Sequence, residues 1–253
     1  MASTPEISAI ILAGQRPGID PLAAAFGLNC KALIPVGGVP MVSRVFRTLK
    51  AHPAIAKTRV MAQDVAALQQ AGDFQVVPSD ETIADTIAPL VAGASEPLLI
   101  TTADHALLDA DMLDSFITKA RGADLAIGMV ERRTLVAAYP QSKRTWLIFR
   151  GGAYSGANLF WIGSPKIMPL LDIWKQVEQK RKRGRALLGA FGPLILIGVA
   201  LRLLILEGAL ARVGARFGIR IVPVILPQAE ACIDVDSVAD HALVERIIAA
   251  RTA

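Results

Sequence analysis

Apolar and polar positions follow one another along this chain in the order typical of an α/β protein. Short continuous apolar runs at residues 7–12 and 96–103 predict strands buried in the middle of a parallel sheet. Apolar residues at helical spacing over residues 41–50 and 110–121 predict helices that cover such a sheet. Weaker patterns predict further strands at 57–62, 74–77, 124–130 and 219–226, and further helices at 65–70, 81–92 and 240–251. We expect Ser79 or Asp80 to cap helix 81–92, and Asp240 to cap the last helix.

The pattern changes after residue 139. Residues 145–149 alternate, Gly151 and Gly152 predict a turn, and residues 153–162 predict a strand, so a hairpin is expected here. Ser164 and Pro165 then mark the start of a helix. A helical insertion near residues 164–216 follows, within what we expect to be a single domain over residues 1–253.

Residues 186–206 are almost entirely apolar and follow a basic run at residues 180–183. A transmembrane helix needs about 20 apolar residues, but Arg202 and the pair Gly192-Pro193 interrupt this stretch. We therefore expect it to be buried within the protein or in a homodimer interface. Peripheral contact with a membrane remains open, because the basic run suits anionic headgroups.

Composition narrows the classes of function. The chain has 253 residues, of which 53% are hydrophobic and 19% charged, so it can bury a large core. A net charge of +5 favours anionic ligands, whereas the low aromatic content and the lack of nucleic-acid-binding motifs argue against nucleic acid. The two cysteines form no metal or redox motif, and no signal peptide is recognisable, so we expect a cytoplasmic protein.

The loop after the first apolar run carries phosphate-binding chemistry. Gly14 lets backbone N–H groups approach a ligand, and such groups form an anion-binding concavity. Arg16 and Lys31 can converge on the same phosphate chain, and the sequence matches neither of the two common phosphate-binding glycine motifs. Asp104 follows the second apolar run, at the edge where parallel sheets bind their ligands.

The segments LAGQRPG, from Leu12, and KALIPVGGVPM, from Lys31, resemble the signature of nucleotidyltransferases with a glycosyltransferase-A-like fold. That group includes molybdenum cofactor guanylyltransferases and sugar-1-phosphate nucleotidyltransferases. Gln15 stands where the family has a second glycine, and residues 19–30 form an insert. The segment IDVDSVADH, from Ile233, resembles the terminal element of the family. The resemblance implies a single Rossmann-like domain with a mixed, mostly parallel sheet flanked by helices.

The resemblance also implies roles for individual residues. Asp104 and Asp236 would hold Mg²⁺, with Asp234 as an alternative to Asp236, and Lys31 and Arg16 would act on the phosphates. The nucleotide would contact Leu12, Ala13, Gly14, Gln15, Ser79 and Thr82, although the last two can equally be helix-capping residues. The acceptor would contact Gly156, Asn158 and Arg144.

The implied reaction transfers a nucleoside monophosphate from an NTP to a phosphorylated acceptor and releases pyrophosphate. Such a reaction needs positioning and charge compensation more than a general base. Molybdopterin, sugar phosphates and phosphorylated alcohols all remain open as acceptors. The alternatives are a nucleotide-sugar-dependent glycosyltransferase of the same fold and a non-catalytic nucleotide-binding module.

Overall fold

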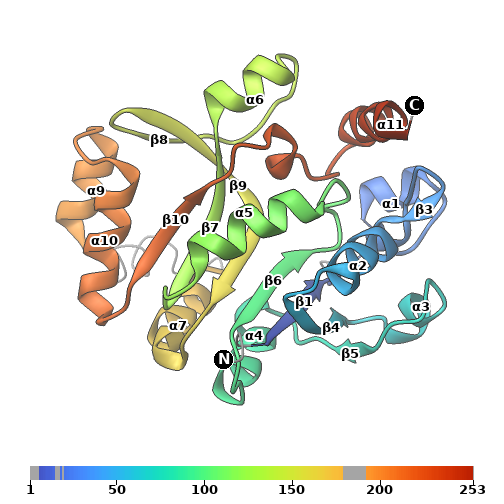
Figure 1. Ribbon diagram of the computed structural model, residues 1–253, viewed down its shortest axis with the longest axis horizontal. Helices are drawn as coiled ribbons and strands as arrows, with labels where there is room; N and C mark the ends of the chain where they lie inside the picture. Colours follow the sequence, from blue (N-terminus) through green and yellow to red (C-terminus); the bar gives the residue numbers. More distant parts are fainter. Residues whose placement is uncertain (1–5, 15–17, 19, 179–191, 253) are drawn as a thin grey trace.

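The computed structural model describes residues 6–14, 18, 20–178 and 192–252, and its elements surround one large sheet (Figure 1). The strands are β1 Ile7–Leu12, β2 Pro35–Val36, β3 Val39–Pro40, β4 Ile55–Ala62, β5 Val76–Pro78, β6 Leu98–Thr102, β7 Leu125–Glu131, β8 Leu147–Phe149, β9 Gly152–Ile162 and β10 Ile221–Ile225. The helices are α1 Pro21–Ala25, α2 Met41–Ala51, α3 Val65–Gln69, α4 Ile83–Ala92, α5 Ala110–Ala120, α6 Arg132–Ala138, α7 Met168–Glu178, α9 Pro193–Ala200, α10 Leu206–Phe217 and α11 Val238–Thr252. Short 3₁₀ turns lie at η1 Lys31–Leu33, η2 Pro165–Ile167 and η4 Ala229–Cys232.

The strand order in the sheet is β10-β7-β9-β6-β1-β4-β5, and β8 pairs with β9 off this path. Strand β1 pairs parallel with both β4 and β6, so the first predicted strand lies inside the sheet. Strand β9 runs antiparallel to β6 and β7 and joins the two parallel parts. The expected α/β architecture with a mixed, mostly parallel sheet flanked by helices is therefore confirmed.

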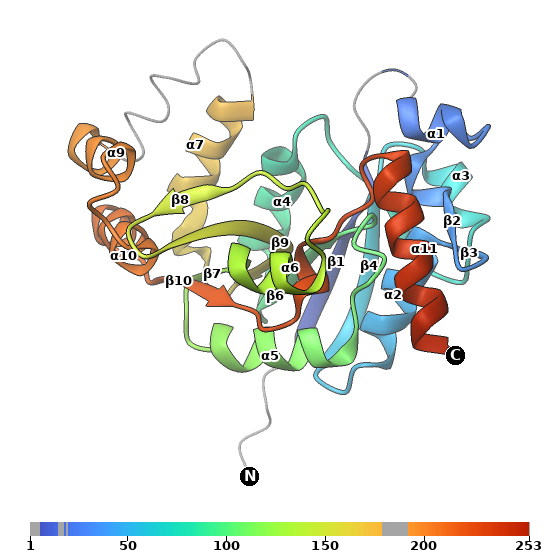
Figure 2. The ribbon, with the colours of Figure 1, turned by 90° about the horizontal axis from the view of Figure 1, so that it is seen from above.

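Apolar residues on both faces of the sheet explain why its central strands are continuously apolar. In β1, Ala9 and Ile11 belong to one core cluster and Ile10 to the other, as the alternation of side chains along a strand requires. Figure 2 shows α2 and α5 on one side of the strands and α4 and α7 on the other. Each face thus has its own helical layer, and the carboxyl ends of β1 and β6 remain available for a site.

A close backbone approach fixes the end of β9. Gly163 donates its N–H to the carbonyl of Asp124 at 2.9 Å. A Cβ at position 163 would lie 2.2 Å from the carbonyl oxygen of Ala123, which no real Cβ tolerates. Only glycine therefore lets the chain leave β9 in this direction without moving the start of β7.

Two local predictions need correction, and one helix was missed. Helix α4 begins at Ile83 with Thr82 as its N-cap, because the Thr82 hydroxyl accepts the N–H of Asp85; neither Ser79 nor Asp80 caps it. Helix α11 begins at Val238, so Asp240 is inside its first turn, and Ser237 accepts the Asp240 N–H instead. Helix α6 was not predicted, because it opens with polar residues and buries Leu135 alone.

The apolar stretch 186–206 is not one buried helix where the structure describes it. Helix α9 ends at Ala200, Arg202 takes a positive φ of 54°, and α10 begins only at Leu206. Ile197 and Leu201 are more than half exposed, so the prediction that this stretch is buried within the protein is wrong for these two side chains. Residues 180–183 and 186–191 lie outside the described residues. Among the described helices, none is long and apolar enough to cross a membrane.

Candidate functional site

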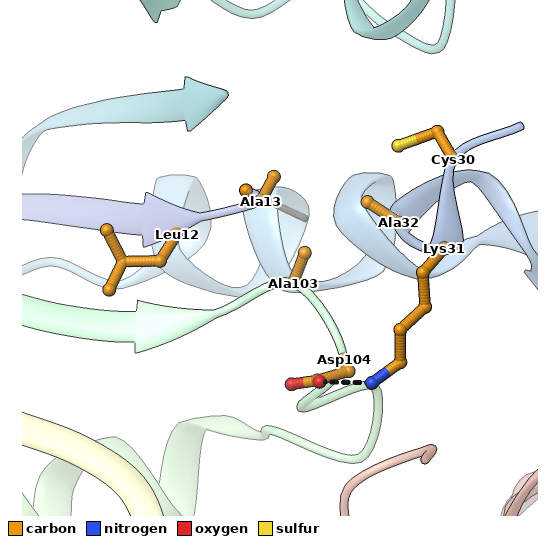
Figure 3. A pocket seen from close by; sticks show the side chains of 8 residues that line it. Leu12, Ala13, Cys30, Lys31, Ala32, Ala103 and Asp104 are labelled. Carbon is orange, nitrogen blue, oxygen red and sulfur yellow. Dashed lines mark hydrogen bonds and ion pairs between the residues drawn. The ribbon is translucent and has the colours of Figure 1, made fainter. Parts of the chain in front are cut away.

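The site forms where β1 and β6 end side by side. The N–H of Ala103 donates to the Leu12 carbonyl, and the N–H of Ala13 donates to the Met61 carbonyl, each at 2.9 Å. The first bond holds the end of β6 against β1, and the second holds the end of β1 against β4. A pocket opens at this edge, as Figure 3 shows, and it is lined by Leu12, Ala13, Gly14, Cys30, Lys31, Ala32, Ala103 and Asp104.

Lys31 reaches across the pocket from η1. Its neighbours Cys30 and Ala32 are buried in the core, and the N–H groups of Leu33 and Ile34 close the 3₁₀ turn on Cys30 and Lys31. This arrangement fixes the backbone of Lys31 and leaves its side chain over the pocket. The ammonium group lies 2.7 Å from Asp104 Oδ2 (Figure 3) and 2.5 Å from Asp236 Oδ1. Two carboxylates separated by more than 130 positions in the sequence therefore share one cation.

The charges of this trio support one another. Burial alone would lower the pKa of Lys31, but the charge of Asp104 and the hydrogen bonds that Lys31 donates to both carboxylates outweigh burial and raise it. Lys31 therefore stays protonated at all physiological pH values. An ammonium group has three donors, and the two carboxylates take two of them. A third donor remains for a phosphate oxygen entering the pocket.

Asp104 is oriented by its neighbours as well as by Lys31. The Thr102 hydroxyl donates to Asp104 Oδ1 at 2.5 Å, and the Val235 N–H donates to the Asp104 carbonyl at 3.2 Å. The second bond ties the segment before α11 to the end of β6. His105 is fully buried, and burial lowers its pKa to about 4, so its imidazole is neutral. It contacts Thr101 and does not line the pocket.

Arg144 forms a clamp on the same segment. Its guanidinium donates to the Asp234 carboxylate, to the Asp234 carbonyl at 3.1 Å and to Asp240 Oδ1 at 2.9 Å. Its side chain is only 8% exposed. Burial and the charge of Asp236 raise the pKa of Asp234 to about 6, and Arg144 opposes this shift. We call these contacts the Arg144 clamp; they fix Asp234 two residues before Asp236.

Asn158 completes the clamp from β9. The pairing of β7 with β9 shifts register between Ile127 and Met129, which indicates a bulge at this place. Asn158 takes a positive φ of 48°, a conformation that asparagine tolerates better than most residues. Its Nδ2 donates to Asp234 Oδ2 at 3.2 Å. Asn158 and Arg144, both expected to contact an acceptor, thus meet on Asp234.

Three other predicted site residues, Ser79, Thr82 and Gly156, do not line the pocket. Ser79 and Thr82 lie beyond β5; the Thr82 hydroxyl is engaged with Asp85, whereas Ser79 Oγ is buried without a hydrogen-bond partner among the described residues. Gly156 is exposed on β9, and a Cβ there would meet nothing within 4 Å. Gln15 and Arg16 lie outside the described residues.

Two oriented carboxylates are suited to Mg²⁺, which prefers oxygen ligands and often takes only one or two from protein. Asp104 and Asp236 already accommodate a positive charge between them, in the form of the Lys31 ammonium group. The described residues contain no group of three or more His, Cys, Asp or Glu side chains placed to hold a metal. A magnesium ion here would therefore take its remaining ligands from substrate phosphates and water.

The sequence predicted Lys31, Asp104 and Asp236 as site residues, but it did not predict the contacts that orient them. The orienting roles of Thr102 and Arg144 depend on contacts between distant segments. The Thr102 contact had one local signal, a hydroxyl two residues before the aspartate at a strand end. The Arg144 clamp had none, since its partners lie 90 and 96 positions away.

Comparison with known proteins agrees with this geometry. The MobA-like NTP transferase domain matches residues 9–189. A solved structure described as a hypothetical transferase from Thermus thermophilus has 26% sequence identity and a TM-score of 0.78, covering 93% of this chain and 99% of its own. No curated protein matches this chain.

Two more distant structures share the fold. One is a CMP:2-keto-3-deoxy-manno-octonic acid synthetase complexed with CTP, with 14% identity and a TM-score of 0.60, covering 97% of this chain and 99% of its own. The other is the 4-diphosphocytidyl-2C-methyl-D-erythritol synthase from Anaerococcus prevotii, with 11% identity and a TM-score of 0.59 at the same coverage. At these identities the similarity concerns the fold alone.

Proposed function

Because this chain belongs to the MobA-like NTP transferase family, we propose that it transfers a nucleoside monophosphate from an NTP to a small phosphorylated acceptor. A phosphate oxygen of the acceptor forms a new bond to the α-phosphorus. The bond from the α-phosphorus to the bridging oxygen breaks, and the electron pair leaves with pyrophosphate. The observation that carries the proposal is the sharing of Lys31 by Asp104 and Asp236 beside the loop that follows β1.

The residues of the chain have separate tasks in this reaction. The backbone at Ala13 and Gly14 lines the pocket where the phosphate chain would lie. Lys31 keeps one donor for a phosphate oxygen and compensates the negative charge that grows on the leaving pyrophosphate. Charge compensation of this kind acts in the transition state, where it lowers the barrier most effectively.

We propose Mg²⁺ as the cofactor, held by Asp104 and Asp236. When bound, it would neutralise phosphate charge and help to align the α-phosphate. Thr102 orients Asp104, and the Arg144 clamp fixes the segment that carries Asp236. These contacts support the proposal, because they hold both carboxylates close to the Lys31 ammonium group.

The nucleotide and the acceptor occupy opposite sides of this centre in our proposal. Gly14 and Ser79 would face the nucleotide, and Gln15, Arg16 and Thr82 remain predicted nucleotide or phosphate contacts. The acceptor would approach along β9, past Gly156. Sugar phosphates, phosphorylated alcohols and molybdopterin are the acceptor classes that we would test.

The proposal is tested with the purified protein, Mg²⁺ and a panel of ATP, GTP, CTP and UTP with each acceptor class. We expect pyrophosphate release from one combination, in a 1:1 ratio with a nucleotide-linked product. Release of a nucleoside diphosphate from a nucleotide sugar would identify a glycosyltransferase instead. Tight binding of an NTP without turnover of any combination would identify a non-catalytic module. The variant Asp236→Asn tests the proposed metal ligand in this assay. Asp111→Asn, at an exposed position at the start of α5, is its control.

A further inference from the structure

Exposed apolar side chains gather at one end of the molecule, and we call this cluster the apolar end. Ten large hydrophobic residues are prominently exposed among the described residues, and six of them come from two segments. These six are between 44% and 63% exposed, and they are Leu147, Ile148, Ile197, Leu201, Leu203 and Ile205. A cluster of exposed apolar side chains of this kind indicates an interaction surface, whereas single exposed apolar residues are common on protein surfaces.

The two segments that form the apolar end lie side by side. The Arg150 N–H, at the turn between β8 and β9, donates to the Leu204 carbonyl at 2.9 Å. Figures 1 and 2 both show the β8–β9 turn beside the connection from α9 to α10. Leu147 and Ile148 are neighbours on β8 and point to opposite faces, yet both are exposed. Apolar surface is therefore exposed on both faces of this strand.

Basic residues outnumber acidic ones in the two segments that carry the apolar end. Residues 143–154 and 193–217 contain six cations and one acid, Glu207. Arg144 is engaged in its clamp, but Arg150 and Arg202 are exposed beside the apolar side chains. A surface that is both apolar and cationic complements an anionic and partly apolar one.

This charge distribution decides between the two occupants that an apolar surface commonly has. In a two-fold dimer the same patch faces itself, so the cations of one copy would approach those of the other. An anionic membrane instead attracts every cation, and its acyl region accepts leucine and isoleucine side chains. We propose that the apolar end docks on an anionic lipid surface, with Leu201 and Leu203 entering the headgroup region and Arg150 and Arg202 contacting lipid phosphates.

The experiment is flotation of the full-length protein with two kinds of vesicle. One kind contains phosphatidylcholine alone, and the other contains phosphatidylcholine with 30% phosphatidylserine, a composition chosen as the probe. At low salt we expect the protein to float with the anionic vesicles only. Raising the salt should weaken binding, because the charges involved are exposed and are screened.

Variants connect this binding to the apolar end. The double variant Leu201→Gln/Leu203→Gln should lower the partition coefficient by roughly tenfold or more, since two apolar side chains no longer insert. Val238→Gln is the matched control, because Val238 is 57% exposed at the start of α11, outside the six residues of the apolar end. Circular dichroism should be unchanged in both variants, and pyrophosphate release should be unchanged in the double variant, since Leu201 and Leu203 lie outside the candidate site.

Four results would overturn the proposal. The protein would fail to float at low salt, or it would float equally with both kinds of vesicle. Flotation with anionic vesicles would persist undiminished in the double variant. Alternatively, light scattering would find a dimer of the wild type that Leu201→Gln/Leu203→Gln converts to a monomer, in which case a second copy covers this surface.

Discussion

Replacing Arg144 with alanine tests how the site is held together. The change removes the guanidinium that contacts the Asp234 carboxylate, the Asp234 carbonyl and Asp240. Two carboxylates then remain close together without their cation, and Asp236 adds a third negative charge nearby. The perturbation therefore leaves uncompensated charge in a partly buried place rather than simply deleting one contact.

The size of the effect follows from burial. Removing one partner of a buried ion pair costs about 3–5 kcal/mol. The Arg144 side chain is 8% exposed, but those of Asp234 and Asp240 are 25% and 18% exposed, so water can still reach them. We therefore expect the lower end, a fall of about 3 kcal/mol in the free energy of unfolding. For a chain of this size, this corresponds to a melting temperature lower by roughly 6–12 °C.

Urea denaturation of the wild type and of Arg144→Ala measures this loss. Arg251→Ala is a control, because Arg251 also pairs with a carboxylate, Asp109, but both side chains are more than a third exposed. That exposed pair should contribute no more than about 1 kcal/mol. Arg144→Lys keeps the charge without the planar fork and should fall between the two. If Arg144→Ala and Arg251→Ala lose the same stability, the clamp does not hold the segment before α11.

Three further predictions concern the proposed chemistry and the fold. Lys31→Ala should lower the rate of pyrophosphate release by about 10²–10³-fold, as expected for loss of one preorganised donor. Removing Mg²⁺ with EDTA should abolish release, and Asp236→Asn should raise the Mg²⁺ concentration needed for half-maximal rate, measured by titration, because one of two protein ligands is lost. Gly163→Ala should destabilise the fold by at least about 1 kcal/mol in urea denaturation, since its Cβ would clash with the Ala123 carbonyl.

Matched variants separate these effects from general damage. Lys50→Ala, at an exposed position near the end of α2, should leave the rate unchanged. Gly93→Ala is the control for Gly163→Ala, because a Cβ at position 93 would meet its nearest atom at an ordinary 3.5 Å. A Lys31→Ala enzyme with nearly full activity would mean that another group binds the phosphates. Unchanged Mg²⁺ dependence in Asp236→Asn would remove that residue from the proposed metal site.

The local pattern of the sequence predicted the central elements well because their signals are short-range. A strand buried on both faces is continuously apolar, and β1 was predicted with its observed bounds, Ile7–Leu12. Helix α5 begins directly after Asp109, whose carboxylate caps its N-terminus. Helix α6 was missed because it buries only Leu135, so it lacks the apolar stripe on which the prediction depended.

The pattern was less informative where the chain depends on distant contacts. Apolarity over residues 186–206 suggested a covered helix, but apolarity alone does not reveal that the chain turns at Arg202. Asp240 resembled a capping residue, yet its carboxylate binds Arg144. Likewise, the sequence indicated that Asp104 and Asp236 act together, but not that Lys31 would bridge them. The two ion pairs of Lys31 join residues 73 and 205 positions apart, and no periodic pattern in the sequence indicates contacts over such separations.

The fate of the α-phosphorus tests the central claim most directly. The assay supplies each NTP labelled at the α-phosphate, together with Mg²⁺ and the acceptor that supports pyrophosphate release. We predict that the label moves into the acceptor product, one label for each pyrophosphate released, and that Lys31→Ala slows both together. Label that remains in NTP, or appears only in free nucleoside monophosphate whatever acceptor is present, would contradict the proposed nucleotidyl transfer.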